Sequence, residues 1–84
     1  MKMFSENSQA VLKFLQSHDG QYTANDIAEA LGIRPQSVNG VVTSLQRKHL
    51  AERLTVDGFE KKVIALTTAG ATVDPEMEKV EGAE

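Results

Sequence analysis

The stretch Thr23–Leu54, TANDIAEALGIRPQSVNGVVTSLQRKHLAERL, decides the fold of this chain. Thr23 is placed to cap a helix, because Asp26 stands three residues later in the acidic position of a capping box. Gly32 is placed to end that helix in the left-handed conformation. Pro35 suits the first turn of the next helix, where its missing N–H costs nothing. The stretch therefore predicts a short helix, a tight turn and a second helix that runs into a strand.

Three helices with apolar stripes are predicted before the first strand. In each, apolar residues follow the helical spacing that marks one buried face. The first helix begins after the cap Ser5 and ends at Asp19-Gly20, and His49 closes the third because histidine tolerates left-handed geometry better than most residues. The stripes are Val11, Leu12, Phe14, Leu15 and His18 in the first helix, Ile27, Ala28 and Leu31 in the second, and Val38, Val41, Val42 and Leu45 in the third.

Two strands are predicted around Asp57-Gly58, over residues 50–56 and 59–66. A two-residue loop between them would place Ile64 on the mainly polar face of the hairpin, whereas a longer loop would turn Ile64 inward. We prefer the longer loop, because Leu66 leads into the segment where the core should close. The sequence thus predicts an α+β fold, a small winged helix of three helices followed by a β-hairpin wing.

Charge is distributed unevenly along the chain, whose formal net charge is −3. Residues 74–84 carry a net −4, so the −3 of the whole chain leaves +1 for residues 1–73. Between residues 34 and 62, six basic residues face three acidic ones. We therefore predict a domain over 1–73 and an acidic, flexible tail over 74–84. The less favoured alternative is a short turn that Asp74-Pro75 would cap and that would bear Met77 and Val80.

The outer face of the helix over 35–48, opposite its apolar stripe, carries only small or hydrogen-bonding side chains. A merely solvated helix would usually carry Glu–Lys pairs there. Glutamine and asparagine can bond adenine edges in the major groove, a threonine methyl can meet a thymine methyl, and arginine can take guanine or phosphate. We therefore predict a recognition helix that reads double-stranded DNA, in preference to a packed helix with an ordinary polar outside. The predicted base contacts are Gln36, Ser37, Asn39, Gly40, Thr43 and Arg47.

Gly40 is costly in a helix interior, by about 1 kcal/mol relative to alanine. Its presence indicates a close approach of the helix backbone to a groove wall or to a neighbouring helix. Nearby basic and polar residues are candidates for phosphate contacts, which give affinity without sequence information. Arg34 is equally well interpreted as an exposed turn residue that contacts no phosphate. The basic wing over 56–62 is equally well interpreted as an ordinary charged hairpin. The predicted backbone contacts are Arg34, Ser44, Lys48, Arg53, Lys61 and Lys62.

No catalytic or metal-binding constellation can be assembled from the sequence. The chain has no cysteine, which excludes a disulfide framework, a thiol nucleophile and a cysteine-based zinc site. His18 and His49 lie far apart and lack local ligand partners, so we interpret them as helix-end residues. No signal peptide is apparent, and no apolar stretch approaches the length that spans a membrane. We predict a cytoplasmic protein that is not an enzyme and has no cofactor or metal.

Over roughly Phe4–Gly70, the chain resembles the winged helix-turn-helix domains of bacterial transcription regulators, particularly the MarR-like group. The resemblance implies that the helix over 35–48 enters the major groove and that the wing lies on flanking DNA. It also implies a short strand near Gln21-Tyr22. The motifs that carry it are Thr23-x-x-Asp26-Ile27-Ala28-x-x-Leu31-Gly32-Ile33, Pro35-x-Ser37-Val38, Leu45-x-x-x-x-Leu50-x-Glu52-Arg53 and Leu66-Thr67-x-x-Gly70.

Three features depart from the pattern of MarR-like regulators. These proteins usually dimerise through long terminal helices, and the sequence predicts none after Gly70. His49 stands where a glycine usually follows the recognition helix, and the arginine-rich wing is reduced to Lys61-Lys62. We therefore expect a compact regulator without an effector domain, in which any homodimer forms through the first helix. The alternative function is a winged-helix interaction module that docks a protein partner through the same helix face or the acidic tail.

Overall fold

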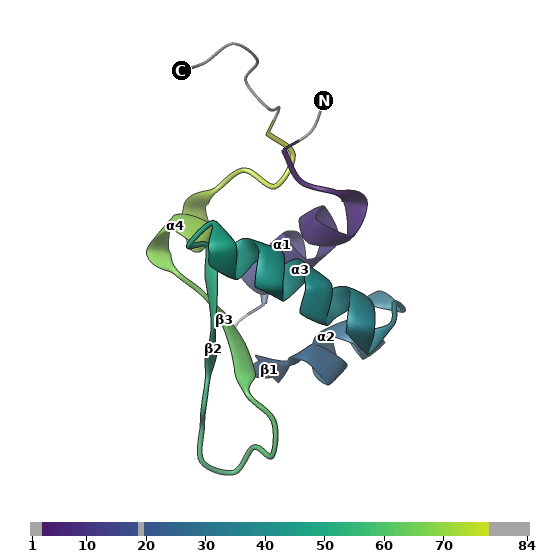
Figure 1. Cartoon of the computed structure of the whole chain (residues 1–84), viewed down its shortest axis with the longest axis vertical. Helices are drawn as coiled ribbons and strands as arrows, with labels where there is room; N and C mark the ends of the chain where they lie inside the picture. Colours follow the sequence, from purple (N-terminus) through teal and green to yellow (C-terminus); the bar gives the residue numbers. More distant parts are fainter. Residues whose placement is uncertain (1–2, 19, 78–84) are drawn as a thin grey trace.

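A computed structural model describes residues 3–18 and 20–77 and arranges them as an α+β winged helix (Figure 1). The predicted fold is confirmed, together with the short strand that the family resemblance implies. The sequence pattern did not indicate the last helix, which begins where the Thr67 hydroxyl accepts a hydrogen bond from the Gly70 N–H. In chain order the elements are α1 (Glu6–Ser17), β1 (Tyr22–Thr23), α2 (Ala24–Leu31), α3 (Pro35–Arg47), β2 (Ala51–Leu54), β3 (Val63–Leu66) and α4 (Thr68–Thr72).

The core forms where α1, α2 and α3 pack together with the sheet. The predicted stripes are largely confirmed, with Phe14, Leu15 and Leu31 half-buried at the edge of the core. The placement of His18 on a buried stripe is wrong, because α1 ends at Ser17 and the exposed imidazole stacks on the Phe14 ring at 4.2 Å between centroids. The buried stripe residues are Val11, Leu12, Ile27, Ala28, Val38, Val41, Val42 and Leu45.

The tight turn between α2 and α3 forms as the local sequence predicts. The Thr23 hydroxyl accepts from the Asp26 N–H at 3.2 Å, and the Asp26 carboxylate accepts from the Thr23 N–H at 3.1 Å, which completes the capping box. Gly32 ends α2 at a φ of 70°. After α3, His49 adopts a φ of 62° and lets the chain turn into β2.

Thr23→Ala is expected to lower the free energy of unfolding by about 1 kcal/mol, because it leaves an N-terminal N–H of α2 without its side-chain acceptor. Urea denaturation followed by circular dichroism measures the change. Thr55→Ala is the matched control, since Thr55 is exposed in the wing loop and caps no helix. An equal urea midpoint for the two variants would show that the box contributes nothing to stability.

The sheet has the strand order β1-β3-β2, and both pairings are antiparallel. Leu54 pairs with Val63, so residues 55–62 form the wing loop, and Ile64 is buried at 3% exposure. The longer loop and the inward Ile64 are therefore confirmed. The predicted strands are too long at the wing end, because the chain there extends away from the helices and has no core to cover (Figure 1). The predicted Asp57-Gly58 turn is present, closed by the Phe59 N–H donating to the Val56 carbonyl at 3.1 Å.

The segment after α4 returns to α1 and brings the two ends of the described chain together (Figure 1). Gln16 donates to the carbonyls of Gly70 at 2.9 Å and Val73 at 2.7 Å, and the Lys13 ammonium pairs with the Glu76 carboxylate. The turn at Asp74–Met77, the less favoured alternative for this segment, is found here, with Met77 against the core. Val80 and the rest of the predicted acidic tail, residues 78–84, lie outside the described residues. The division of the chain at residue 73 stays a prediction.

Candidate nucleic-acid interface

One side of α3 is free of the core and carries the predicted base contacts. The apolar stripe of the helix is buried, from Val38 at 0% exposure to Leu45 at 0%. Ser37 is half-buried at the margin of the opposite side. The fold therefore brings all six predicted residues to one helix surface. The exposed members are Gln36, Asn39, Gly40, Thr43 and Arg47.

Gly40 faces open space. A Cβ added at this position would have no described atom within 4 Å, apart from its own helix backbone and chain neighbours. The sequence left two explanations for this glycine, a close approach to a groove wall or to a neighbouring helix. No helix in the described part of the chain lies within that distance, so the chain itself does not supply the neighbouring helix.

Exposed cations surround this side of α3. Arg34 stands at the N-cap position but makes no side-chain capping bond, so its guanidinium is not used to begin the helix. At the other end, the Lys48 ammonium donates to the Ser44 hydroxyl at 3.3 Å. Lys61 and Lys62 are exposed in the wing loop just before β3. The basic residues thus lie at both ends of α3 and at the base of the wing.

Arg53 is directed onto α3 rather than outward from the wing. Its guanidinium donates to the side-chain oxygen of Gln46, and to the carbonyl and side-chain oxygens of Asn39 at 3.3 and 3.4 Å. It also reaches the Thr43 hydroxyl at 3.5 Å. Sequence reasoning grouped Arg53 with the wing lysines and missed Gln46. The alternation of β2 was the available signal, because it puts Arg53 on the same side as the buried Ala51.

A polar cleft of about 410 Å³ lies between the start of α2, the exposed side of α3 and the base of the wing. It joins the predicted base contact Asn39 to three of the predicted phosphate contacts in a single concave surface. Such a surface can accept a strand of polyanion, because its three cations outnumber its one acidic residue, Glu60. Its lining residues are Ala24, Asn25, Asn39, Arg53, Glu60, Lys61, Lys62 and Ile64.

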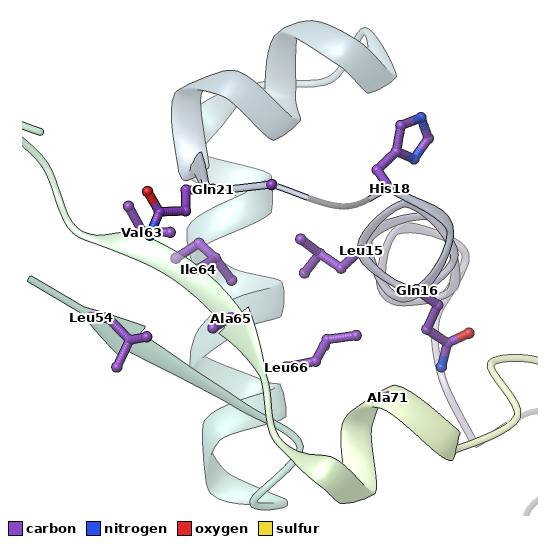
Figure 2. Close-up of a pocket in the computed structure, with 11 residues that line it drawn as sticks. Leu15, Gln16, His18, Gln21, Leu54, Val63, Ile64, Ala65, Leu66 and Ala71 are labelled. Atoms are coloured by element: carbon purple, nitrogen blue, oxygen red, sulfur yellow. The ribbon is translucent and has the colours of Figure 1, made fainter. Parts of the chain in front are cut away.

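A second cleft, of about 370 Å³, lies between the end of α1, β3 and α4 (Figure 2). Figure 2 shows Leu15 of α1 and Ile64 and Leu66 of β3 directed toward one another across it. Among the described residues that line it there is no carboxylate and no predicted site residue. We therefore assign the candidate interface to α3 and the wing.

The described residues hold neither a metal-binding cluster nor a membrane-spanning helix. No group of three or more histidine, aspartate or glutamate residues is arranged to hold a metal ion within residues 3–18 and 20–77. None of the helices described is long and apolar enough to cross a membrane.

The sequence profile of the MarR family matches residues 10–58. No protein with a curated description matches the chain. The solved DNA complex of MepR from Staphylococcus aureus is similar to this chain, with 31% identity and a TM-score of 0.73 over 81% of this chain and 56% of its own. A structure of MepR described as a transcription regulator of the multidrug efflux pump MepA has 34% identity and a TM-score of 0.73, over 82% and 51%.

RV1404 from Mycobacterium tuberculosis is also similar in structure, with 25% identity and a TM-score of 0.72 over 81% of this chain and 46% of its own. The chain therefore spans about half the length of the solved structures that it matches. The part that the family profile matches contains α2, α3, β2 and the first residues of the wing loop.

Proposed function

We propose that this chain, which belongs to the MarR family, is a sequence-specific transcription regulator that binds double-stranded DNA. In this proposal the recognition helix over 35–48 enters the major groove and the wing over 56–62 lies on flanking DNA. The protein acts in the cytoplasm, where it meets its operator.

The observation that carries the proposal is the composition of the exposed side of α3. The helix contains no acidic residue, so none of its side chains repels phosphate. Apart from Pro35 and Gly40, its exposed positions hold two amides, a hydroxyl and an arginine, which are groups that read base edges. The similarity to MepR, which was solved as a complex with DNA, supports the same kind of partner.

Each residue of the interface has a role in the proposal. Gln36 bonds an adenine edge, Asn39 bonds a purine edge, the Thr43 methyl meets a thymine methyl, and Arg47 takes guanine or phosphate. Ser37 and Gly40 let the helix approach the base edges closely. The phosphate contacts, which position the domain without reading sequence, are Arg34, Ser44, Lys48, Arg53, Lys61 and Lys62.

Useful affinity requires two half-sites or a partner, because one small domain with few basic residues binds DNA weakly. We propose a homodimer through α1 as the means. Lys13 and Gln16 on α1 already contact residues 70–76 of their own chain, so the dimer uses the remaining exposed side, which includes Asn7. Sedimentation of the full chain with and without a duplex carrying two half-sites measures the oligomeric state.

Selection of bound duplexes from a random pool tests the proposed function. The full chain is expected to enrich a defined motif, and its affinity for that motif should fall steeply with salt. The segment 34–62 contains six basic residues. One protomer therefore gives a slope of log affinity against log salt no steeper than about −5. Weak, salt-insensitive binding with no enriched motif would favour the protein-interaction alternative.

Arg47→Ala is expected to weaken binding to the selected duplex by about fivefold or more, because the variant loses either a guanine contact or a phosphate contact. Fluorescence anisotropy at two salt concentrations measures the loss. Lys13→Ala is the matched control: it removes the same charge from an exposed position on α1 and should change affinity less than twofold. Equal losses in the two variants would mean that only net charge matters.

A further inference from the structure

We propose that Arg53 is a positioning residue that sets the hydrogen-bonding polarity of the recognition surface. It engages the acceptor oxygens of Asn39 and Thr43 and leaves their donor groups for the bases. The inference rests on the proposed function and specifies which bases the site prefers. It also gives Arg53 a role beyond the phosphate contact that the sequence predicts.

The position of Arg53 is fixed by the sheet rather than by the wing loop. Arg53 is paired with Ile64, which is buried at 3% exposure in the core. Successive side chains of a strand point to opposite faces. Arg53 therefore lies on the same side as Ala51, which is buried at 4% exposure, and its side chain leaves the sheet toward α3. A guanidinium that starts from this strand has a defined reach along α3.

The four acceptors of Arg53 form one stripe along α3. Asn39, Thr43 and Gln46 are spaced i, i+4 and i+7, which places them on one side of the helix. One terminal nitrogen of the guanidinium donates to Gln46, and the other donates to both Asn39 oxygens and to the Thr43 hydroxyl, at 3.3, 3.4 and 3.5 Å. Lysine could not make this set of bonds, because it lacks the planar fork of donors.

Every one of these acceptors is a neutral oxygen. Among the residues that the structure describes, no carboxylate forms an ion pair with Arg53. The positive charge of Arg53 is therefore not cancelled by a partner. It lies in the same cleft as the wing lysines Lys61 and Lys62, where three cations stand against the single acidic residue Glu60.

The chemistry of the guanidinium dictates how the amides are oriented. Arginine has donors only, so the side-chain oxygens of Asn39 and Gln46 must face it and their NH₂ groups must turn away. Asparagine reads adenine by presenting both its oxygen and its NH₂ group to one base edge. With its oxygen held by Arg53, Asn39 presents mainly donors, which match the two acceptors of guanine, N7 and O6. We therefore expect Asn39 to read guanine, in place of the adenine expected from the sequence.

Selection from a random duplex pool, run in parallel on variants, tests this inference. Asn39→Ala identifies the base position that Asn39 reads, as the position whose preference disappears. Wild type should prefer guanine there. Arg53→Lys keeps the charge and removes the fork, so it should relax that preference and lower the ratio of motif to non-motif affinity by about fivefold or more. Its affinity for a duplex without the motif should fall by a smaller factor than its affinity for the motif, because the charge that attracts phosphate is kept.

Lys62→Ala is the control for charge on the DNA-facing side. It removes one cation from the wing without touching α3, so it should weaken binding to all duplexes by a similar factor and keep the base preference. Melting curves of each variant check that the fold is intact. Arg53 is only half-buried, so the melting temperature of Arg53→Lys should stay close to that of wild type.

The outcomes separate this inference from the proposed function. A wild-type protein that enriches no motif overturns both. If Arg53→Lys selects the wild-type motif with an unchanged ratio of motif to non-motif affinity, the positioning role of Arg53 is overturned and the proposed function stands. Adenine at the position read by Asn39 overturns the proposed polarity. The inference is supported if Arg53→Lys loses the base preference at that position while Lys62→Ala loses affinity for all duplexes by a similar factor.

Discussion

Replacing Gly70 with alanine is expected to remove about 3 kcal/mol or more from the free energy of unfolding. A Cβ at this position would lie 1.8 Å from the carbonyl oxygen of Leu50, a backbone atom that no rotamer change can move. The total stability of a domain of this length is about 4–12 kcal/mol. The variant should therefore lose a large part of it, and its melting temperature should fall by about 10 °C or more.

The surroundings of Gly70 explain why the backbone cannot yield. The Leu50 carbonyl accepts from the Thr67 N–H at 3.0 Å, and the Thr67 hydroxyl donates to the His49 carbonyl at 2.8 Å and accepts from the Gly70 N–H at 3.1 Å. These bonds join the start of α4 to the corner between α3 and β2. Moving Gly70 away from Leu50 breaks them together.

Circular dichroism melting of Gly70→Ala measures the loss, and Gly40→Ala is the matched control. The two substitutions add the same methyl group to a helical glycine, but Gly40 has open space around it. The control should gain stability while Gly70→Ala loses it. A Gly70→Ala variant that melts within about 2 °C of wild type would contradict the close approach of α4 to Leu50.

The parts of the fold that could be predicted from sequence depend on local chemistry. Thr23 and Asp26 are three residues apart and cap α2 through hydrogen bonds to each other. Gly32 readily adopts the positive φ that ends α2, and the ring of Pro35 restricts its own φ to a value that suits the first turn of α3. Each of these signals acts within one turn of chain, and all of them are found in the structure. The buried stripe of α3 also follows from spacing alone.

The parts that could not be predicted depend on distant residues. The wing strands stop at Leu54 and Val63, because their length is set by what they pack against and not by their β propensity. Met77 returns to the core because Gln16, on another element, binds the segment before it. The helix α4 depends on the same contact, because Gln16 donates to the carbonyl of Gly70 within it.

The candidate site divides in the same way. The exposed side of α3 follows from helical spacing, so the set of Gln36, Asn39 and Thr43 could be found from sequence. The direction of Arg53 could not, because it depends on the register of β2 against β3 and on the distance from β2 to α3. Gln46 was missed for the same reason: its role comes only from Arg53. Distinguishing phosphate contacts from base contacts residue by residue therefore needs the structure as well as the helical spacing.

Gly40→Ala is expected to stabilise the protein by about 0.5–1 kcal/mol and yet weaken binding to the selected duplex by about tenfold or more. The stability gain follows because alanine restricts the unfolded chain and its methyl meets no described atom. The binding loss follows because that methyl stands on the exposed side of α3, between Gln36 and Thr43 in the space where a base edge would lie. It would hold the helix backbone away from the groove and lengthen the hydrogen bonds on either side.

The expected gain in stability and loss of affinity make this test specific, since a misfolded variant would lose both stability and affinity. Melting curves and anisotropy titrations on the same preparations give both quantities. Thr72→Ala is the control for stabilisation alone: Thr72 is exposed on α4, away from α3 and from the proposed dimer surface, so the variant should melt higher and bind the duplex as wild type does. If Gly40→Ala binds the selected duplex with wild-type affinity, the α3 backbone does not approach the groove closely. The helix would then read DNA through its longer side chains alone.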